Sequence, residues 1–316
     1  MSSIPRQTRQ WILTNKPTDH PSLTGPSPTF TLETNHLPDL KDDQILVKSV
    51  YFSNDPAQRG WISKDVDPAR LYTTPVPQGA VMRAGAIAEV VDSKSSKFKK
   101  GDTVRASMGW AEYAVQDASA CQPVQHIPGV SDTHYLGALG NTGLTAWYGL
   151  EVARAGKDDA VVVSGAAGGT GSMVVQIAKK ILGCRKVIGM AGSEEKCMWV
   201  ESLGADVCVD YKKPDFKEKL FEATEGFVEV YFDNVGGEIL DLMLLRMARH
   251  GRVAACGAVS DYNKSEATGL KNWYEVISKS CLLFQYAPTC SGKRNSWGDI
   301  PTKYLCGSFH NFSFYI

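Results

Sequence analysis

The stretch from Asp159 to Ala178 constrains the fold more than any other part of the chain. Four consecutive apolar residues, Ala160 to Val163, lead directly into a glycine-rich turn. After this turn, apolar residues recur at helical spacing, at Val174, Val175, Ile177, Ala178, Ile181 and Leu182. A strand, a tight glycine turn and a helix in this order are the context that a dinucleotide-binding loop needs.

The turn itself fits a phosphate-binding pattern. The six residues from Ala166 to Gly171 match G-x-G-x-x-G, with alanine in the place of the first glycine. Gly168 would let the backbone approach a pyrophosphate, Gly171 would let the helix pack against its strand, and the helix N-terminus would supply N–H donors. A plain tight turn is the alternative, but a second apolar run, Lys186 to Met190, closes a βαβ-sized segment of about 30 residues. The predicted cofactor-binding residues of this loop are Ala166, Gly168, Gly169, Thr170 and Gly171.

Length and composition bound the remaining possibilities. A chain of 316 residues is too long for one ordinary core, so two domains are expected. The 34 basic and 34 acidic residues balance, which argues against nucleic acid or an anionic membrane as a partner. No apolar run reaches the roughly 20 residues that cross a bilayer, and the first residues lack a signal-peptide pattern. A cytoplasmic protein is therefore expected.

Cysteine and histidine spacing predicts no metal site. The eight cysteines form no C-x-x-C pair, and the six histidines are far apart along the chain. We expect the cysteines to be buried, reduced thiols.

The two parts of the chain differ in rhythm. Residues 1–131 contain short β-type patterns bounded by turn residues and no dinucleotide loop, so we predict a β-rich substrate-side domain there. Its clearest strand patterns are 11–13, 45–52, 85–91 and 110–115. Residues 132–280 begin with a helical connector over 134–155, and strands then alternate with helices, which predicts a parallel sheet covered on both faces. The later elements expected there are strands at 205–209, 228–232 and 253–256 and a helix at 239–248.

The end of the second predicted strand favours NADP(H) over NAD. In NAD-binding folds, an acidic residue about 20 positions after the glycine loop holds the ribose 2′-hydroxyl. Here the strand ends at Gly192 and Ser193 without a carboxylate. Two glutamates follow, but Ser193 is a typical N-cap and the helix dipole favours acids in a first turn. Lys196, one turn into that helix, is placed to meet a 2′-phosphate.

Several segments, in this order and at this spacing, carry a resemblance to a known family. They are Ala166–Gly171, Gly192–Lys196, Tyr231–Gly237 and Gly257–Asn263. Nearer the N-terminus, Ser53–Pro56 and Arg59 agree in part with the family's S-x-D-P-Y-M-R segment. Together they resemble the zinc-independent medium-chain dehydrogenase/reductases, in the branch of the prostaglandin reductases and alkenal double-bond reductases. The resemblance covers roughly residues 9–278. It implies a Rossmann doubly wound parallel sheet with an N-terminal GroES-like domain, and usually a homodimer.

The resemblance also implies a reaction. The protein would be an NADP-dependent oxidoreductase acting on the CH–CH group of donors, with an α,β-unsaturated aldehyde or ketone as its small-molecule substrate. Hydride would pass from NADPH to the β-carbon, and the resulting enolate would then be protonated. A zinc-free quinone oxidoreductase is an alternative on the same scaffold.

The resemblance assigns roles to single residues. Lys196 and Tyr211 would contact the adenosine 2′-phosphate, and Gly192 and Ser193 would also bind the cofactor. Asn234 would lie near the nicotinamide half, and Gly257 would also bind the cofactor. Asn54 and Asp55 would lie on the substrate side. Tyr262 would contact the cofactor and protonate or stabilise the enolate. Without the family, Tyr211 and Tyr262 could be ordinary rim tyrosines, and Asp233 and Asn234 turn formers. Ala57 replaces the family's tyrosine, which alters the expected shape of the substrate pocket.

Residues 281–316 depart from the family pattern. They lack the expected alternation of helix and strand, so we predict an atypical tail with low order from about Cys290. A cofactor-binding but catalytically impaired protein with an interaction role is a further alternative that this tail leaves open.

Overall fold

The computed structural model of the chain describes residues 4–64, 67–264, 266 and 268–285. These residues separate into two compact units. The first contains the chain up to Gly140 and a short segment that starts at Tyr262. The second runs from Asn141 to Asp261 and continues from Glu266 to the end of the described chain.

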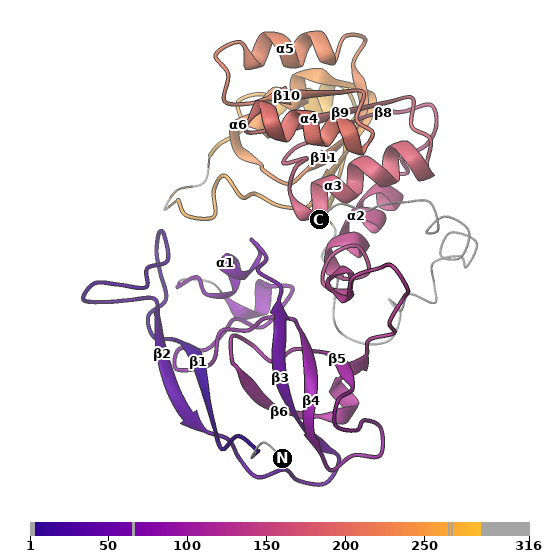
Figure 1. Cartoon of the computed structure of the whole chain (residues 1–316). Coiled ribbons are helices and arrows are strands. Elements are labelled where there is room, and N and C mark those ends of the chain that lie inside the picture. Colours follow the sequence, from indigo (N-terminus) through magenta and orange to yellow (C-terminus); the bar gives the residue numbers. More distant parts are fainter. Residues whose placement is uncertain (1–3, 65–66, 265, 267, 286–316) are drawn as a thin grey trace. The chain divides into compact units, whose positions relative to one another are not determined.

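A six-stranded parallel sheet forms the centre of the second unit (Figure 1). Its strands, in chain order, are β8 (Ala160–Val163), β9 (Lys186–Ala191), β10 (Val207–Asp210), β11 (Val228–Asp233), β12 (Met247–Ala255) and β13 (Leu282–Gln285). Their order across the sheet is β10-β9-β8-β11-β12-β13. The chain thus runs outward on one side from β8 and then outward on the other from β11, so the strand order reverses between these two strands.

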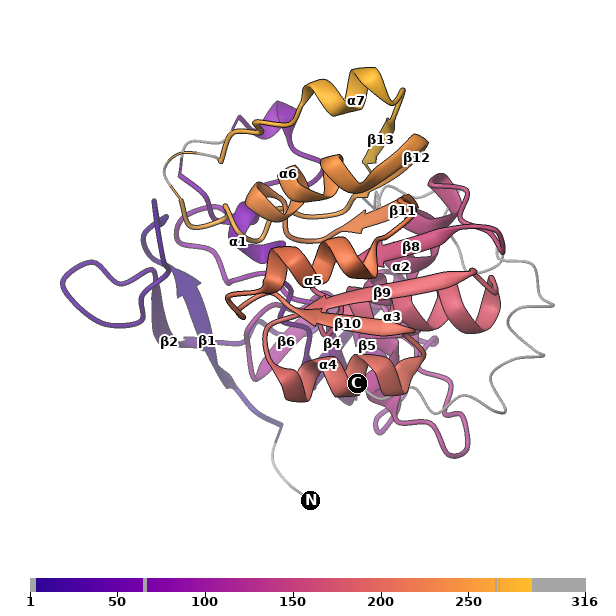
Figure 2. The same cartoon turned by 90° about the horizontal axis from the view of Figure 1, so that it is seen from above.

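Helices cover both faces of this sheet, as Figure 2 shows, with α3 and α4 on one side of the strands and α5 and α6 on the other. The helices of this unit are α2 (Asn141–Val152), α3 (Gly169–Gln176), α4 (Glu194–Leu203), α5 (Phe216–Ala223), α6 (Gly237–Arg246) and α7 (Tyr274–Ser278). All four residues of β8 are buried, which explains the continuous apolar run in the sequence. This arrangement confirms the predicted doubly wound α/β fold.

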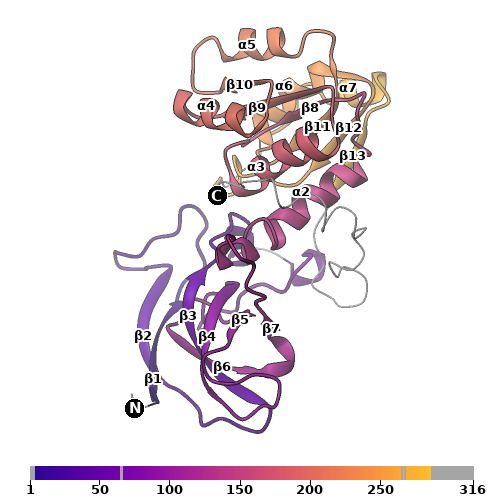
Figure 3. The same ribbon diagram turned by 45° about the vertical axis from the view of Figure 1, so that its right-hand side comes forward.

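The first unit is built from antiparallel strands, all of which Figure 3 labels. A pair, β1 (Gln7–Leu13) and β2 (Phe30–His36), lies beside a five-stranded sheet of order β6-β3-β4-β5-β7. The strands of that sheet are β3 (Gln44–Phe52), β4 (Ala86–Ser93), β5 (Thr103–Ala106), β6 (Tyr113–Asp117) and β7 (Gln122–Pro123). A short helix, α1 (Gln58–Trp61), follows β3. The predicted β-rich N-terminal part is confirmed.

Some element boundaries differ from those expected. The predicted connector over 134–155 consists of a 3₁₀ turn, Asp132–Tyr135, and the separate helix α2. The chain folds back tightly before α2. A Cβ at Gly140 would lie 2.5 Å from the carbonyl oxygen of Tyr135, so this turn leaves no room for a side chain. The predicted helix over 239–248 ends two residues early, because β12 begins at Met247.

The sheet extends into the stretch that was expected to be atypical. β13 pairs in parallel with β12, with Leu282 opposite Arg252. The prediction of low order from Cys290 concerns residues outside those that the structure describes. Within the described ranges, no helix is long and apolar enough to cross a membrane.

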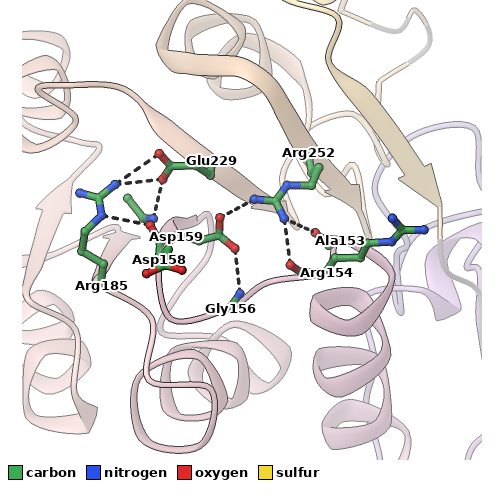
Figure 4. Close-up of polar contacts among 9 residues, drawn as sticks. Ala153, Arg154, Gly156, Asp158, Asp159, Arg185, Glu229 and Arg252 are labelled. Carbon is green, nitrogen blue, oxygen red and sulfur yellow. Dashed lines mark hydrogen bonds and ion pairs between the residues drawn. The ribbon is translucent and has the colours of Figure 1, made fainter.

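A polar network ties the amino-terminal ends of the sheet strands to α2 (Figure 4). The Arg252 guanidinium pairs with Asp159 at 2.5 Å and donates to the carbonyl oxygens of Ala153 and Arg154 at 3.1 and 2.8 Å. The side chains of Arg252 and Asp159 are only 19% and 13% exposed. One guanidinium therefore connects β12, the start of β8 and the C-terminal end of α2.

Loss of this buried charge should destabilise the protein. Arg252→Met keeps the apolar stem but leaves Asp159 buried without its partner, so we expect the free energy of unfolding to fall by about 3–5 kcal/mol. The measurement is urea-induced unfolding followed by tryptophan fluorescence.

Arg185→Met is the matched control. Arg185 also belongs to the network of Figure 4, where it pairs with Glu229, but its side chain is 53% exposed. Loss of its charge should therefore lower the free energy of unfolding by no more than about 1 kcal/mol. Equal losses for the two variants would contradict the role given to Arg252.

Candidate functional site

The loop between β8 and α3 makes its tight turn at Gly165. This residue has φ +58°, and its carbonyl oxygen accepts a hydrogen bond from the Gly168 N–H at 2.9 Å. Ala166, which stands where the pattern has its first glycine, is buried and donates its own N–H to the Met190 carbonyl at 2.9 Å. The conformational role of a glycine thus falls one residue earlier than the pattern suggested. The signal for it was the glycine that stands two residues after the end of β8.

The other glycines of the loop keep the backbone open. A Cβ at Gly171 would lie 2.2 Å from the Gly165 carbonyl oxygen, so only glycine allows α3 to pack this closely on the loop. Gly168 and Gly169 are exposed, and α3 begins at Gly169 with Thr170 next. Among the described residues no side chain caps this helix, so the N–H groups of its first turn can face an anion.

The residues predicted to recognise the adenosine end lie together at the carboxyl ends of β9 and β10. Ser193 accepts a hydrogen bond from the Lys196 N–H at 3.3 Å, which confirms it as the N-cap of α4. Tyr211 donates its N–H to the Ala191 carbonyl at 3.0 Å. A Cβ at Gly192 would lie 2.6 Å from the Tyr211 hydroxyl, so this glycine makes room for the phenol.

A second cation, Lys213, lies near the same strand end. Its Nζ is 3.9 Å from a carboxylate oxygen of Glu194, at the start of α4. Sequence reasoning missed this residue, although the Lys212–Lys213 pair directly after Tyr211 was a visible signal. The negative charge of Glu194 is thereby partly balanced beside Ser193 and Lys196.

The buried carboxylate of Asp233 organises the carboxyl end of β11. The residue is 1% exposed, and its Oδ1 accepts four hydrogen bonds at 2.7–3.1 Å. The donors are the Tyr231 hydroxyl, the Ser164 hydroxyl and the N–H groups of Val235 and Gly236. Burial, followed by the Asp233 charge, raises the pKa of Tyr231 well above its ordinary value, so this phenol remains a donor.

Asn234 and Gly257 flank this carboxylate. The Asn234 amide nitrogen donates to the Ser164 carbonyl at 2.7 Å, which ties the end of β11 to the loop after β8. The Gly257 N–H donates to the Asp233 carbonyl at 3.0 Å. The cofactor residues predicted in the second unit therefore gather along the carboxyl ends of β8 to β12. In open α/β sheets, ligands bind at this edge, where the strand order reverses.

The remaining predicted residues belong to the first unit. Asn54 is exposed, and the Asp55 carboxylate accepts from the Ser53 hydroxyl at 2.9 Å. The Asp55 N–H donates to the side chain of the buried Gln58 at 3.0 Å, which fixes the start of α1. Tyr262 is half-buried in the short segment that this unit contributes from late in the chain. The structure thus places the candidate substrate and proton-donor residues in one unit and the other candidates in the second.

The six described cysteines are free thiols: Cys121, Cys184, Cys197, Cys208, Cys256 and Cys281. Burial raises the pKa of Cys184 to about 11 and that of Cys256 to about 12, and it also raises the pKa of the other four. Their thiols therefore stay protonated at neutral pH. Among the described residues, no group of three or more His, Cys, Asp and Glu side chains is placed to hold a metal ion.

Comparison with known proteins gives two family matches and clear relatives. Residues 9–124 match a model described as the N-terminal domain of oxidoreductase, and residues 169–287 match one described as zinc-binding dehydrogenase. Over 240 residues the chain is 38% identical to prostaglandin reductase 1 of Mus musculus, covering 75% of this chain and 69% of that protein. It is 34% identical over 268 residues to the NADPH-dependent curcumin reductase of Escherichia coli, with coverages of 84% and 74%.

A solved structure agrees with the fold. The crystal structure of CurA from Vibrio vulnificus in complex with NADPH superposes with a TM-score of 0.78 at 32% identity. The match covers 88% of this chain and 82% of that one.

Gly171 should tolerate no side chain. In Gly171→Ala the new Cβ would meet the backbone carbonyl of Gly165, so α3 must shift and the free energy of unfolding should fall by about 1–3 kcal/mol. Thermal unfolding measures this loss. Gly156→Ala is the control in the same unit, because no described atom lies within 4 Å of the added Cβ. An unchanged melting temperature in Gly171→Ala would show that the packing is looser than described.

Proposed function

Because the chain belongs to the zinc-independent medium-chain dehydrogenase/reductases, in the branch of the prostaglandin and curcumin reductases, we propose that it reduces α,β-unsaturated aldehydes and ketones. The bond reduced is the carbon–carbon double bond next to the carbonyl group. The chain is an NADP(H)-dependent oxidoreductase of this family. The names of the relatives support an enone as the substrate.

The observation that carries the proposal is the chemistry at the end of β9. Its tip, Gly192 and Ser193, offers no carboxylate to a ribose 2′-hydroxyl. The Tyr211 phenol lies beside Gly192, Lys196 is in the first turn of the helix that Ser193 caps, and Lys213 pairs with Glu194 at the start of that helix. A cation and a phenol suit a 2′-phosphate, because hydrogen bonds to ionised groups are the strong ones. The set therefore fits the adenosine end of NADPH.

The loop after β8 fits the pyrophosphate of the same cofactor. Gly168 and Gly169 are exposed at the N-terminus of α3, and a Cβ at Gly168 would lie 3.2 Å from the Gly165 carbonyl oxygen. A bare backbone with a positive helix end is the environment that a dinucleotide diphosphate uses. Asn234, at the end of the neighbouring strand β11, would hold the nicotinamide half.

When bound, NADPH supplies a hydride to the β-carbon of the substrate. Negative charge then gathers on the carbonyl oxygen as an enolate, where one well-placed hydrogen-bond donor is worth roughly 3–4 kcal/mol. The α-carbon must also receive a proton, and a positioned acid contributes on the order of 10²–10⁴ in rate. We assign this donor role to Tyr262, with Asn54 and Asp55 on the substrate side.

The assay that tests the proposal follows NADPH consumption by the full-length protein with an aliphatic 2-alkenal and, separately, with a quinone. Turnover of the alkenal to the saturated aldehyde is the expected result. Turnover of the quinone alone would replace the proposed reaction with quinone reduction. NADPH binding without turnover of either compound would contradict it in favour of an impaired, cofactor-binding protein.

Lys196 should set the preference for NADPH. In Lys196→Gln the charged partner of the 2′-phosphate is lost, so NADPH affinity should fall by about 10- to 100-fold while NADH affinity stays the same. Fluorescence titration with both cofactors measures the change. Lys157→Gln is the control, since Lys157 is exposed before β8, at the opposite end of the sheet. An equal fall for both cofactors would speak against a phosphate contact.

Tyr262 should affect the chemical step rather than cofactor binding. Tyr262→Phe removes only the hydroxyl, so kcat for the alkenal should fall by about 10²-fold, while the NADPH dissociation constant should change by no more than about twofold. Steady-state kinetics and titration separate the two effects. Tyr274→Phe removes the same hydroxyl from an exposed tyrosine on α7 and should have no effect. A Tyr262→Phe variant as active as the parent would rule out this assignment.

A further inference from the structure

We propose that Arg59 is a positioning residue that holds Tyr262 in place through Asn263. This proposal rests on the proposed function, because that function gives the Tyr262 hydroxyl its role as proton donor. The contact that carries it is a hydrogen bond of 2.9 Å from Arg59 Nε to Asn263 Oδ1. Asn263 is the next residue after Tyr262, and the two side chains lie 203 and 204 positions after Arg59 in the sequence.

Arg59 is itself held firmly. Its Nη1 donates to the Ser63 hydroxyl at 2.9 Å, and its Nη2 donates to the carbonyl oxygens of Asp19 and Pro17 at 2.8 and 3.4 Å. All three nitrogens of the guanidinium are therefore engaged, and the planar fork fixes their directions. Burial lowers the pKa of Arg59 and the Asp19 charge opposes that shift, yet an arginine stays charged at any physiological pH.

The Asn263 amide is held on its other side as well. Its Nδ2 lies 3.2 Å from His20 Nδ1. Because arginine can only donate, its bond to Asn263 fixes the amide with oxygen toward Arg59 and nitrogen toward His20. One side chain beside the candidate proton donor is thus clamped by two residues from near the start of the chain.

The ends of the loop that carries Tyr262 are fixed separately. The Asp261 carboxylate accepts from the Thr268 N–H at 3.0 Å and from its hydroxyl at 2.8 Å. These bonds belong to the second unit, whereas Tyr262 and Asn263 belong to the first. Loss of Arg59 would therefore remove one restraint on the segment that carries the phenol, while the bonds between Asp261 and Thr268 remain. This design allows the position of Tyr262 to be disturbed without unfolding either unit.

Position matters here because proton transfer requires the donor within hydrogen-bond reach of the α-carbon. A displacement of about 1 Å can cost on the order of 10²-fold in rate. Arg59 makes no contact with substrate or cofactor in this account, so its effect must act through the phenol. That condition separates a positioning role from a general structural one.

Arg59→Met in the full-length protein tests the proposal. We expect kcat for the alkenal to fall about tenfold, with NADPH affinity within about twofold of the parent. The same change in a Tyr262→Phe background should lower kcat by no more than about twofold further, because the effect of Arg59 requires the hydroxyl. Arg6→Met is the matched control in the same unit, since Arg6 is 76% exposed and pairs only with a surface carboxylate, Asp39, among the described contacts.

Additive losses in the double variant would overturn the proposal, because Arg59 would then act independently of Tyr262. A loss of NADPH affinity equal to the loss in kcat would overturn it as well, because Arg59 would then be supporting cofactor binding. Asn263→Ala provides the second variant, with the same tenfold loss and no further loss when combined with Arg59→Met.

Hydrogen exchange gives a readout that does not depend on turnover. The amides of Tyr262, Asn263 and Lys264 should exchange faster in Arg59→Met than in the parent and in Arg6→Met. If the parent protein fails to reduce the alkenal, the proposed function is wrong. Faster exchange in Arg59→Met would still show that Arg59 holds the segment around Tyr262. Unchanged exchange at these amides would contradict the positioning role of Arg59, whatever the activity of the variant.

Discussion

The hydrogen bonds to the buried carboxylate of Asp233 hold the carboxyl edge of the parallel sheet together. One oxygen accepts from Ser164 after β8, from Tyr231 within β11 and from two N–H groups of the following turn. Burying a charge costs free energy unless hydrogen-bond donors replace the lost water. Removal of any of these four donors would therefore leave the buried carboxylate less well stabilised. The Asp233 carbonyl also anchors the chain after β12. Every loop that would contact the cofactor leaves the sheet from this organised edge.

The two ends of the sheet have different tasks. At the amino ends, Arg252 and Asp159 join strands and helix α2 through a nearly buried ion pair. At the carboxyl ends, Gly168, Gly192 and their neighbours leave backbone and side-chain donors open to a ligand. The charges that support stability are therefore separate from those that would bind phosphate. A surface lysine at the binding edge can be exchanged without disturbing the buried network.

Much of the fold could be predicted because parallel strands that are buried on both faces leave a direct record in sequence. The run Ala160–Val163 and the glycine spacing after it identified β8, its loop and α3. Strand β2 was not predicted, because Phe30–His36 contains few apolar residues and lies largely exposed. Strand β13 was not predicted, because it forms by pairing with β12, about 30 residues away, and has no local sequence pattern of its own.

The same distinction applies to the site. Residues with a fixed spacing from the glycine loop, such as Ser193 and Lys196, were found, since local spacing determines where a strand ends and a helix begins. The hydrogen bonds that join Asp233 to Ser164 and Asn263 to Arg59 were not predicted, because these partners lie about 70 and 200 residues apart in the sequence. Gly165 was missed for another reason, since the pattern has its first glycine at position 166, whereas the backbone makes its positive-φ turn one residue earlier.

The buried thiols bear on how such an enzyme would survive its own chemistry. α,β-Unsaturated aldehydes are electrophiles that alkylate thiolates, and only the thiolate form of cysteine is a strong nucleophile. Burial withdraws Cys184, Cys197 and Cys281 from the surface, and the raised pKa values keep all six described thiols in the unreactive form. If the protein binds enals as substrates, the six described thiols would thus resist alkylation by them. The packing that buries these cysteines would then also protect them from alkylation.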